Sequence, residues 1–172
     1  MKISDIKIAV ARKHLSGVGK VSAGNVQSCK MALLLDAGDE DSVSSFLQFF
    51  QELGLREEEV SIVVCKEKPG KNDIFEYSFI SLKDFGWNGK LTASSSAFLQ
   101  AEYDVLISFT ASENKMADFL VSVTRSRLKV GRKKEDENGI FDLNISADLL
   151  KPEVFIAELK KYLKILKRQP NE

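Results

Sequence analysis

The sequence is poor in the residues on which most metal sites and disulfide scaffolds depend. Its 172 residues include one histidine, two cysteines and one tryptophan. A single histidine excludes a histidine-rich or two-metal site, and the two cysteines lie too far apart in sequence for a zinc-binding pair. Disulfides are not needed for folding, because a chain of this length buries about two thirds of its unfolded surface. The sequence therefore predicts no metal site, and it identifies no cofactor.

Long hydrophobic runs are also missing. The longest uninterrupted apolar stretch is residues 31–35, far short of the roughly 20 residues that a spanning helix needs. Asp5 and Lys7 fall where the apolar part of a secretory signal would have to lie. We therefore expect a cytoplasmic protein without a membrane span. In that compartment Cys29 and Cys65 are expected to stay reduced.

The net formal charge is zero, but the charge is unevenly distributed. Residues 1–30 carry six Lys or Arg against one acid, residues 151–168 carry six against two, and residues 31–150 have a net charge of minus eight. Two interpretations stay open: basic terminal helices that dock an anionic partner, or two solvated amphipathic helices. Nucleic acid is not an expected partner, because no aromatic residues interleave with the basic clusters as stacking platforms.

The N-terminal part is predicted as a helix followed by a linker. Ile3, Ile6 and Val10 recur at helical spacing, which indicates a short amphipathic helix ending near Leu15. Residues 16–28 are rich in glycine and serine and should form a loop. Residues 1–29 thus precede a sheet core over residues 30–150 and a C-terminal helix over residues 151–168. No repeat or long linker interrupts this order, so residues 1–172 are predicted to form one domain.

Short apolar runs alternate with amphipathic helical patterns along the core of the sequence. Such runs are typical of strands that are buried on both faces of a parallel sheet. Residues 75–80 follow a connection that is short for a parallel crossover, so they are predicted as an antiparallel or edge strand. The alternation indicates an α/β fold, a three-layer, Rossmann-like, mostly parallel sheet of about five to six strands with helices on both faces. The predicted strands are residues 30–36, 60–65, 75–80, 103–108, 128–131 and 141–145, and the predicted helices of the core are residues 43–54, 95–101 and 114–124.

Several of these segments resemble an uncharacterised Bacteroidetes-type family of small α/β proteins, known only as a domain of unknown function. The resemblance is carried by the strand segments 31–36, 103–108, 128–131 and 141–145 and by the segment 83–90, which reads KDFGWNGK. The family usually has an aromatic residue between its Trp and its Gly, where this chain has Asn88. The resemblance implies an α/β fold and no particular reaction.

Residues 103–132 are also similar to the N-terminal half of heptosyltransferase-like GT-B enzymes. A strand, a helix and a short strand ending in glycine recur in the same order, and Gly38 and Asp39 resemble the Gly-Asp that carries the proposed catalytic base of that family. The Thr-Pro of that motif and the sugar-nucleotide-binding domain have no counterpart here. The similarity implies a sugar-directed site.

A candidate site follows from the expected strand order. In open α/β sheets, ligands bind beyond the carboxyl ends of the strands, where the winding direction reverses. If residues 103–108 lie beside residues 31–36, that crevice lies between the loops 36–41 and 109–114. The acidic first loop and the hydroxyl-rich second loop suit a cation, an amine or a sugar. The predicted ligand-binding residues are Asp36, Gly38, Asp39, Thr110 and Ser112, with Trp87 either lining a pocket or packing at the sheet edge.

The same residues have a simpler interpretation. Asp36 ends a strand as the nucleophile of some phosphotransferases does, but the second acid of that pattern is replaced by Gly38. An acidic turn that caps a helix also accounts for Asp36 and Asp39. The function is therefore left unknown, with three hypotheses. The first is a non-catalytic or small-ligand-binding α/β domain, the second an enzyme with a Mg-assisted or sugar-directed site at the C-terminal sheet edge, and the third an interaction module using its basic terminal helices. The partner is an unknown small molecule or protein, and the oligomeric state is not determined.

Overall fold

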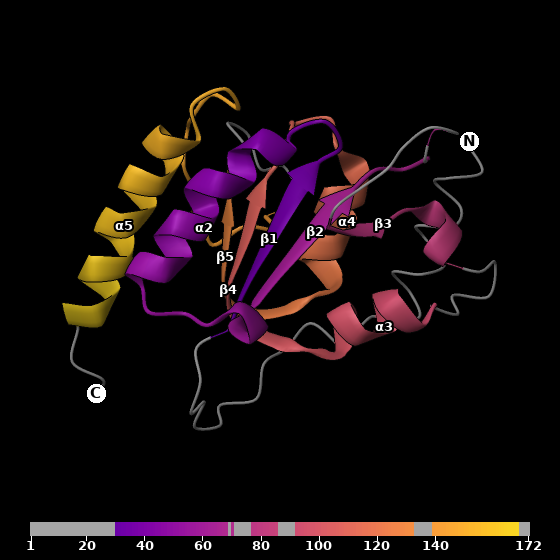
Figure 1. The fold of residues 1–172 in the computed structure, drawn as a ribbon, viewed down its shortest axis with the longest axis horizontal. Helices are drawn as coiled ribbons and strands as arrows, with labels where there is room; N and C mark the ends of the chain where they lie inside the picture. Colours follow the sequence, from indigo (N-terminus) through magenta and orange to yellow (C-terminus); the bar gives the residue numbers. More distant parts are fainter. Residues whose placement is uncertain (1–29, 69, 71–76, 86–91, 133–138, 169–172) are drawn as a thin grey trace.

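A computed structural model describes residues 30–68, 70, 77–85, 92–132 and 139–168 and has a six-stranded sheet at its centre (Figure 1). The strand order is β3-β2-β1-β4-β5-β6, and every neighbouring pair is parallel. This is the order of doubly wound Rossmann sheets, in which the chain reverses its direction of winding between β1 and β4. The predicted fold class is confirmed. The strands are β1 (Met31–Asp36), β2 (Val60–Cys65), β3 (Ser78–Ile80), β4 (Glu102–Phe109), β5 (Arg125–Gly131) and β6 (Leu143–Asn144).

Helices cover both faces of the sheet (Figure 1). The helices α2 (Val43–Glu52) and α5 (Pro152–Arg168) lie side by side on one face, and α3 (Ala93–Gln100) and α4 (Lys115–Val123) pack on the other. Short 3-10 turns, η1 (Glu40–Ser42), η2 (Glu57–Glu59) and η3 (Leu82–Asp84), connect elements. None of the helices in the described part of the chain is both long and apolar enough to cross a membrane.

The central strand β1 is apolar throughout because it is enclosed on every side. It pairs with β2 on one edge and with β4 on the other, and residues 31–35 are all buried. Successive side chains of a strand point to opposite faces. Leu33 and Leu35 therefore pack under α2, whereas Leu34 packs toward α4. Burial of each leucine is worth about 2 kcal/mol, and this accounts for a run that lacks polar alternation.

The core on the α2 and α5 face is centred on three phenylalanines. Phe46 of α2, Phe109 at the end of β4 and Phe155 of α5 are essentially inaccessible to solvent. The Phe109 ring centroid lies 5.2 Å from those of both Phe46 and Phe155, and the Phe46 and Phe155 centroids lie 6.1 Å apart. Tilted pairs at this spacing are favourable for aromatic rings. The triad joins α2, α5 and the sheet near the carboxyl ends of the strands.

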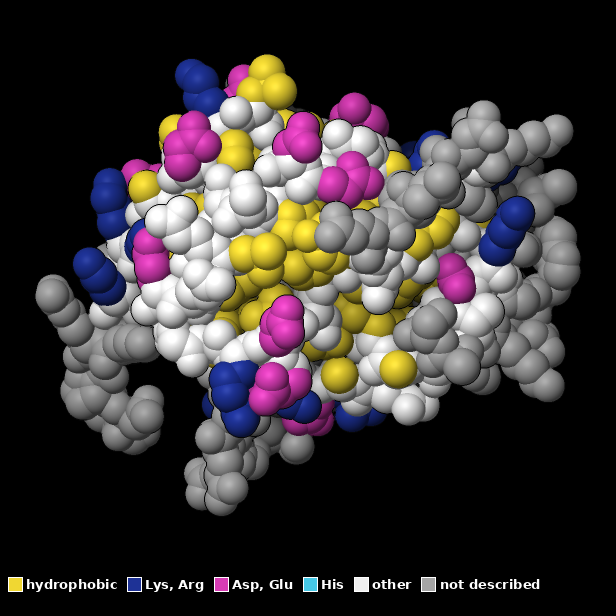
Figure 2. All heavy atoms as spheres, viewed as in Figure 1, with side chains coloured by type: hydrophobic (Ala, Val, Ile, Leu, Met, Phe, Trp, Pro, Cys, Tyr) yellow, Lys and Arg dark blue, Asp and Glu magenta, His cyan; other side chains and the backbone are white. Residues whose placement is uncertain are grey.

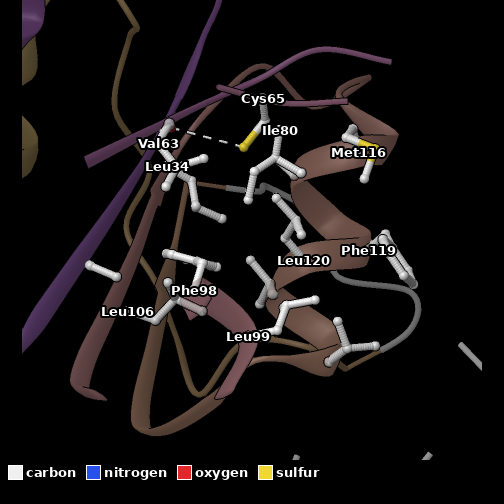
Figure 3. Packing of buried hydrophobic residues seen from close by; sticks show 14 of the residues in the cluster. Leu34, Val63, Cys65, Ile80, Phe98, Leu99, Leu106, Met116, Phe119 and Leu120 are labelled. Atoms are coloured by element: carbon white, nitrogen blue, oxygen red, sulfur yellow. Dashed lines mark hydrogen bonds between the residues drawn. The ribbon is translucent and has the colours of Figure 1, made fainter. Parts of the chain in front are cut away.

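The core on the opposite face is formed by α4 against β1, β2 and β4 (Figure 3). Phe119 of α4 meets Phe85 edge-on, with centroids 5.2 Å apart. Cys65 is a free cysteine within this cluster, and its thiol donates a weak hydrogen bond of 3.9 Å to the carbonyl of Val63. Burial, with a smaller contribution from the nearby Asp36 carboxylate, raises the pKa of the Cys65 thiol.

The structure confirms the predicted edge position of residues 75–80 and shows the direction of that strand, which the sequence left open. The strand predicted as antiparallel or edge, β3, lies at the sheet edge but runs parallel to β2, with Val64 opposite Phe79. The connection of residues 66–77 is long enough to return the chain to the amino end of the sheet. The predicted edge strand over residues 141–145 is confirmed as β6. The predicted N-terminal helix, Cys29 and Trp87 lie outside the described residues.

Candidate functional site

The two loops predicted to border the crevice lie together at the carboxyl ends of β1 and β4, and the side chain of Asp36 bridges them. One oxygen, Oδ2, accepts a 2.7 Å hydrogen bond from the backbone N–H of Ala111, and the other, Oδ1, accepts a 2.6 Å hydrogen bond from the Asn114 amide. The predicted reversal point between β1 and β4 is therefore real. Asp36 uses both of its oxygens to close it.

Asn114 holds this edge of the sheet together, and the sequence analysis assigned it no role. Its amide Nδ2 donates to Asp36 and also, at 3.1 Å, to the carbonyl of Cys65 at the end of β2. Its Oδ1 accepts from the backbone N–H of Ala117, so that Asn114 is the N-cap of α4. One side chain thus joins β1, β2 and α4. The available signal was an asparagine at the predicted start of a helix.

Asp39 has the least satisfied carboxylate of this loop. Its Oδ1 accepts a 3.1 Å hydrogen bond from the Ser42 hydroxyl, whereas its Oδ2 is buried without a hydrogen-bond partner in the structure. Burial raises the pKa of the Asp39 carboxyl, and the neighbouring carboxylates, Asp36 foremost, add to that shift, against the opposing effect of the Ser42 hydrogen bond. Gly38 before it is exposed and has a φ of 91°, which only glycine adopts without strain.

The remaining predicted residues are dispersed. The Thr110 hydroxyl is buried and paired with that of Ser108 at 2.8 Å, so it is directed into the protein. Ser112 is exposed on the loop surface, and Trp87 is not among the described residues. The structure brings Asp36 next to the 110–112 loop through the Ala111 N–H, whereas the Thr110 hydroxyl is bonded inward to Ser108 and Ser112 lies on the surface. Within the described residues, no three His, Cys, Asp or Glu side chains are grouped to hold a metal ion.

A cavity of about 770 Å³ lies at the opposite, amino-terminal edge of the sheet. It is bordered by the starts of β1 and β4 and by the C-terminal halves of α2 and α5, which pack against each other. Sequence reasoning missed it, because the space depends on how α5 lies against α2. Six lining residues are apolar: Met31, Phe49, Leu53, Leu55, Val105 and Leu163.

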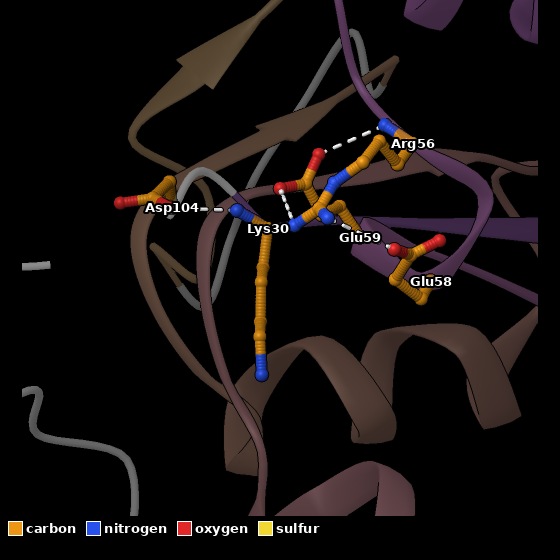
Figure 4. Close-up of polar contacts among 5 residues, drawn as sticks. All are labelled: Lys30, Arg56, Glu58, Glu59 and Asp104. Carbon is orange, nitrogen blue, oxygen red and sulfur yellow. Dashed lines mark hydrogen bonds and ion pairs between the residues drawn. The ribbon is translucent and has the colours of Figure 1, made fainter. Parts of the chain in front are cut away.

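The polar groups of this cavity are five charged side chains. Glu52 of α2 and Lys160 of α5 form an ion pair of 2.5 Å across the helix contact. Asp104 lies 3.9 Å from Arg127, and its Oδ2 also accepts a 2.8 Å hydrogen bond from the backbone N–H of Lys30 (Figure 4). Lys164 is exposed and has no carboxylate partner within the described ranges. The lining therefore carries one more positive than negative charge.

The turn that leads into β2 is fixed by an ion-pair cluster (Figure 4). The Arg56 guanidinium lies 3.2 Å from Glu59 and 3.3 Å from Glu58, and the Arg56 backbone N–H donates to Glu59 Oε2 at 2.8 Å. The Arg56 and Glu58 side chains are exposed, so the ion pairs contribute little stability. The contacts of Arg56 with Glu58 and Glu59 fix the start of η2. They thereby orient Leu55, the residue before Arg56, which lines the cavity.

Residues 9–166 match the sequence model of a family of unknown function, DUF6913. The chain belongs to this family. The match spans the whole sheet, α2, α3 and α4, and α5 up to residue 166. Searches among curated proteins and among solved structures find no match. The similarity to heptosyltransferase-like enzymes is not tested by the family match and stays a prediction.

Proposed function

We propose that this DUF6913 protein is a non-catalytic, small-ligand-binding domain whose site is the amino-edge cavity between α2 and α5. The observation that carries the proposal is a cavity of about 770 Å³ with a mainly apolar lining and a surplus of basic groups. Small-molecule sites are generally apolar concavities of roughly 300–1,000 Å³ with a few polar groups that orient the ligand. The fit is to an amphipathic molecule with an apolar body and one anionic group, such as a fatty acid.

The charges support an anionic head group at the α5 side of the cavity. Glu52 is neutralised by Lys160, and Asp104 faces both Arg127 and a backbone N–H. Lys164 is left to attract an anion. The lining groups best suited to act as general bases, the carboxylates of Glu52 and Asp104, are already paired with Lys160 and with Arg127 and the Lys30 N–H. We therefore propose binding, not turnover, as the activity of this cavity.

A second candidate is the predicted site at the carboxyl edge, favoured by the buried, unpartnered Oδ2 of Asp39. An amine or a sugar hydroxyl donating to this oxygen would satisfy it. Such a ligand would lie over Gly38 and reach toward Ser112. Asp36 and Thr110 would not contact it but would hold the loop in place through their hydrogen bonds to Ala111 and Ser108. This site is the basis of the enzymatic alternative, a Mg-assisted or sugar-directed reaction.

Calorimetric titration of the full chain with decanoate tests the leading proposal. Leu163→Glu places a carboxylate in the cavity, and we expect it to weaken decanoate binding by more than about tenfold, equivalent to roughly 1.4 kcal/mol. Tyr162→Glu is the matched control, because Tyr162 is 42% exposed on the same helix and does not line the cavity. Equal effects of the two substitutions, or no binding by the unmodified protein, would contradict the proposal. Binding of a sugar or an alkyl amine that is lost in Asp39→Asn but kept in Leu163→Glu would support the carboxyl-edge site.

We also infer that residues 1–172 act as one domain in the cytoplasm. The fully buried, free thiol of Cys65 supports a reducing compartment. Mass spectrometry of the protein from its native cells, alkylated before lysis and again after denaturation, tests this. A Cys65 found in a disulfide would argue against it.

A further inference from the structure

On the α2 side of the sheet, the two strands β2 and β3 lack a covering helix among the described elements (Figure 1). A right-handed crossover from β2 to β3 would place its helix on this face, as α2 is placed between β1 and β2. The described part of that connection, residues 66–68, 70 and 77, contains no helix. Parallel sheets are normally covered on both faces.

The uncovered area has an apolar surface, called here the β2 face: Leu47 of α2, Val60 and Ile62 of β2, and Phe79 of β3. Val60 and Ile62 are only half-buried, and Leu47 is 36% exposed. Phe79 is also half-buried, and it pairs with Val64, which points to the same side as Ile62. Figure 2 shows hydrophobic side chains gathered beside α2, over β1 and β2.

The position of Leu47 shows that this surface is separate from the cavity under α5. Glu52 faces α5 through its ion pair with Lys160. Leu47 precedes Glu52 by five residues and is therefore roughly 140° away around the helix, at 3.6 residues per turn. It points to the flank of α2 that faces β2. A ligand in the amino-edge cavity and a segment on the β2 face would not compete.

We propose that residues 3–15 of this chain dock as an amphipathic helix on the β2 face and supply the missing covering helix. The apolar stripe of that segment, Ile3, Ile6 and Val10, spans about 10 Å of helix. The half-buried part of β2 from Val60 to Ile62, extended by Phe79, has a similar length. The apolar stripe and the half-buried β2 face thus match in size, and no described helix covers this face.

The intervening chain is long enough for this arrangement. Residues 16–29 connect the segment to Lys30, which stands immediately before β1 at the amino edge. These residues can span up to about 45–50 Å when extended, whereas β2 is about 20 Å long and its neighbour β1 is about 5 Å away.

Charge complementarity favours residues 3–15 as the occupant of the β2 face and disfavours a second copy of the folded core. Residues 1–30 carry six Lys or Arg against one acid, whereas residues 31–150 have a net charge of minus eight. Acidic side chains flank the β2 face at both ends: Glu57 and Glu58 before β2, and Glu40 and Asp41 before α2. Lys7, Arg12 and Lys13 of the segment would face these groups. Two copies of the core would repel each other there.

Disulfide trapping in the full chain tests the docking. In a Cys29→Ser background, the pair Ile6→Cys and Ile62→Cys should form an intramolecular bond under mild oxidation. We expect this bond to form at least about tenfold faster than the bond of the control pair Lys7→Cys and Ile62→Cys. Docking would hold residue 6 against residue 62, and this raises the effective thiol concentration above the value that the linker alone provides. Cys65 is buried and does not interfere.

Each outcome of this experiment decides the proposal. A monomeric crosslinked product with the stated preference for position 6 supports it. Disulfide-linked dimers at equal or greater yield would overturn it in favour of a second copy as the occupant. Equal rates for positions 6 and 7, or no bond from either, would overturn it as well, since the segment would then be undocked. Circular dichroism of the reduced variants checks that each is folded.

Discussion

The amide Nδ2 of Asn114 lies 2.6 Å from Oδ1 of Asp36, and this contact joins the N-terminus of α4 to the end of β1. At the point where ligands enter most doubly wound sheets, the side chains of Asp36 and Asn114 thus have all their hydrogen bonds within the protein. Asp36 accepts two hydrogen bonds and Asn114 makes three. Both oxygens of Asp36 are occupied within the protein, which gives this residue a structural role.

Asp36→Ala should destabilise the protein by about 2–3 kcal/mol, because it leaves the Ala111 N–H and one Asn114 donor without their charged acceptor. Asp41→Ala, an exposed acid on the same loop, should change stability by less than about 0.5 kcal/mol. Urea unfolding of both variants, of Asn114→Ala and of the double variant Asp36→Ala/Asn114→Ala measures the coupling. A coupling energy below about 0.5 kcal/mol would show that the Asp36–Asn114 contact does not matter.

Asp39→Asn should stabilise the protein at neutral pH. Burial raises the pKa of the Asp39 carboxyl in the folded state, so the folded protein holds this proton more tightly than the unfolded chain does. The contribution of Asp39 to stability is therefore greatest below the ordinary value of 3.8 and is lost as the pH rises through the raised folded pKa. Asparagine removes that loss.

The test compares the unfolding free energies of Asp39→Asn and wild type at pH 7 and at the lowest pH where both stay folded. The advantage of the variant should shrink as the pH falls, and Asp41→Asn serves as the control. A variant that is less stable than wild type by the same amount at both pH values would contradict the account. It would show that the Asp39 charge supports the start of α2.

Cys65 should be unreactive in the folded protein. Its thiol is fully buried and burial raises its pKa, whereas the thiolate is the reactive form. In Cys29→Ser, where Cys65 is the single thiol, Ellman's reagent should react at a rate limited by unfolding and should label completely in denaturant. Labelling of the native variant as fast as of the unfolded chain would mean that this part of the core opens readily.

Gly131→Ala should cost about 1–3 kcal/mol through overpacking. A methyl group at Gly131, the last residue of β5, would come within 2.6 Å of the Phe141 ring. The φ of this glycine is not positive, so the cost comes from the close approach alone. Thermal unfolding should show that Phe141→Leu makes the Gly131→Ala substitution less harmful. An unchanged penalty in the Phe141→Leu background would place its origin elsewhere.

Most of the fold could be predicted because its central strands are buried on both faces. Met31–Asp36, Val60–Cys65 and the middle of Glu102–Phe109 are nearly continuous apolar runs, and such runs have few alternatives to a parallel sheet. The direction of β3 could not be predicted in the same way. Ser78–Ile80 has only three residues at an edge, and its direction depends on the path of residues 66–77.

The candidate site was less accessible to sequence reasoning. The convergence of the loops after β1 and β4 followed from the strand order, and the structure bears it out through the Asp36 contact to Ala111. Whether a carboxylate there is free or occupied depends on the position of Asn114, seventy-eight residues away. The amino-edge cavity depends likewise on the distance between α2 and α5, and no local pattern encodes that distance.

Backbone amide NMR of the full chain, titrated with decanoate to about 1 mM, tests the proposed ligand site most directly, since a ligand with a Kd of that order or tighter would then be substantially bound. The account predicts saturable shift changes at the amino edge of the sheet, at Leu53, Leu55, Val105 and Leu163, and small changes at residues 36–41 and 110–114. Shifts confined to those carboxyl-edge loops, or none at any residue, would contradict it.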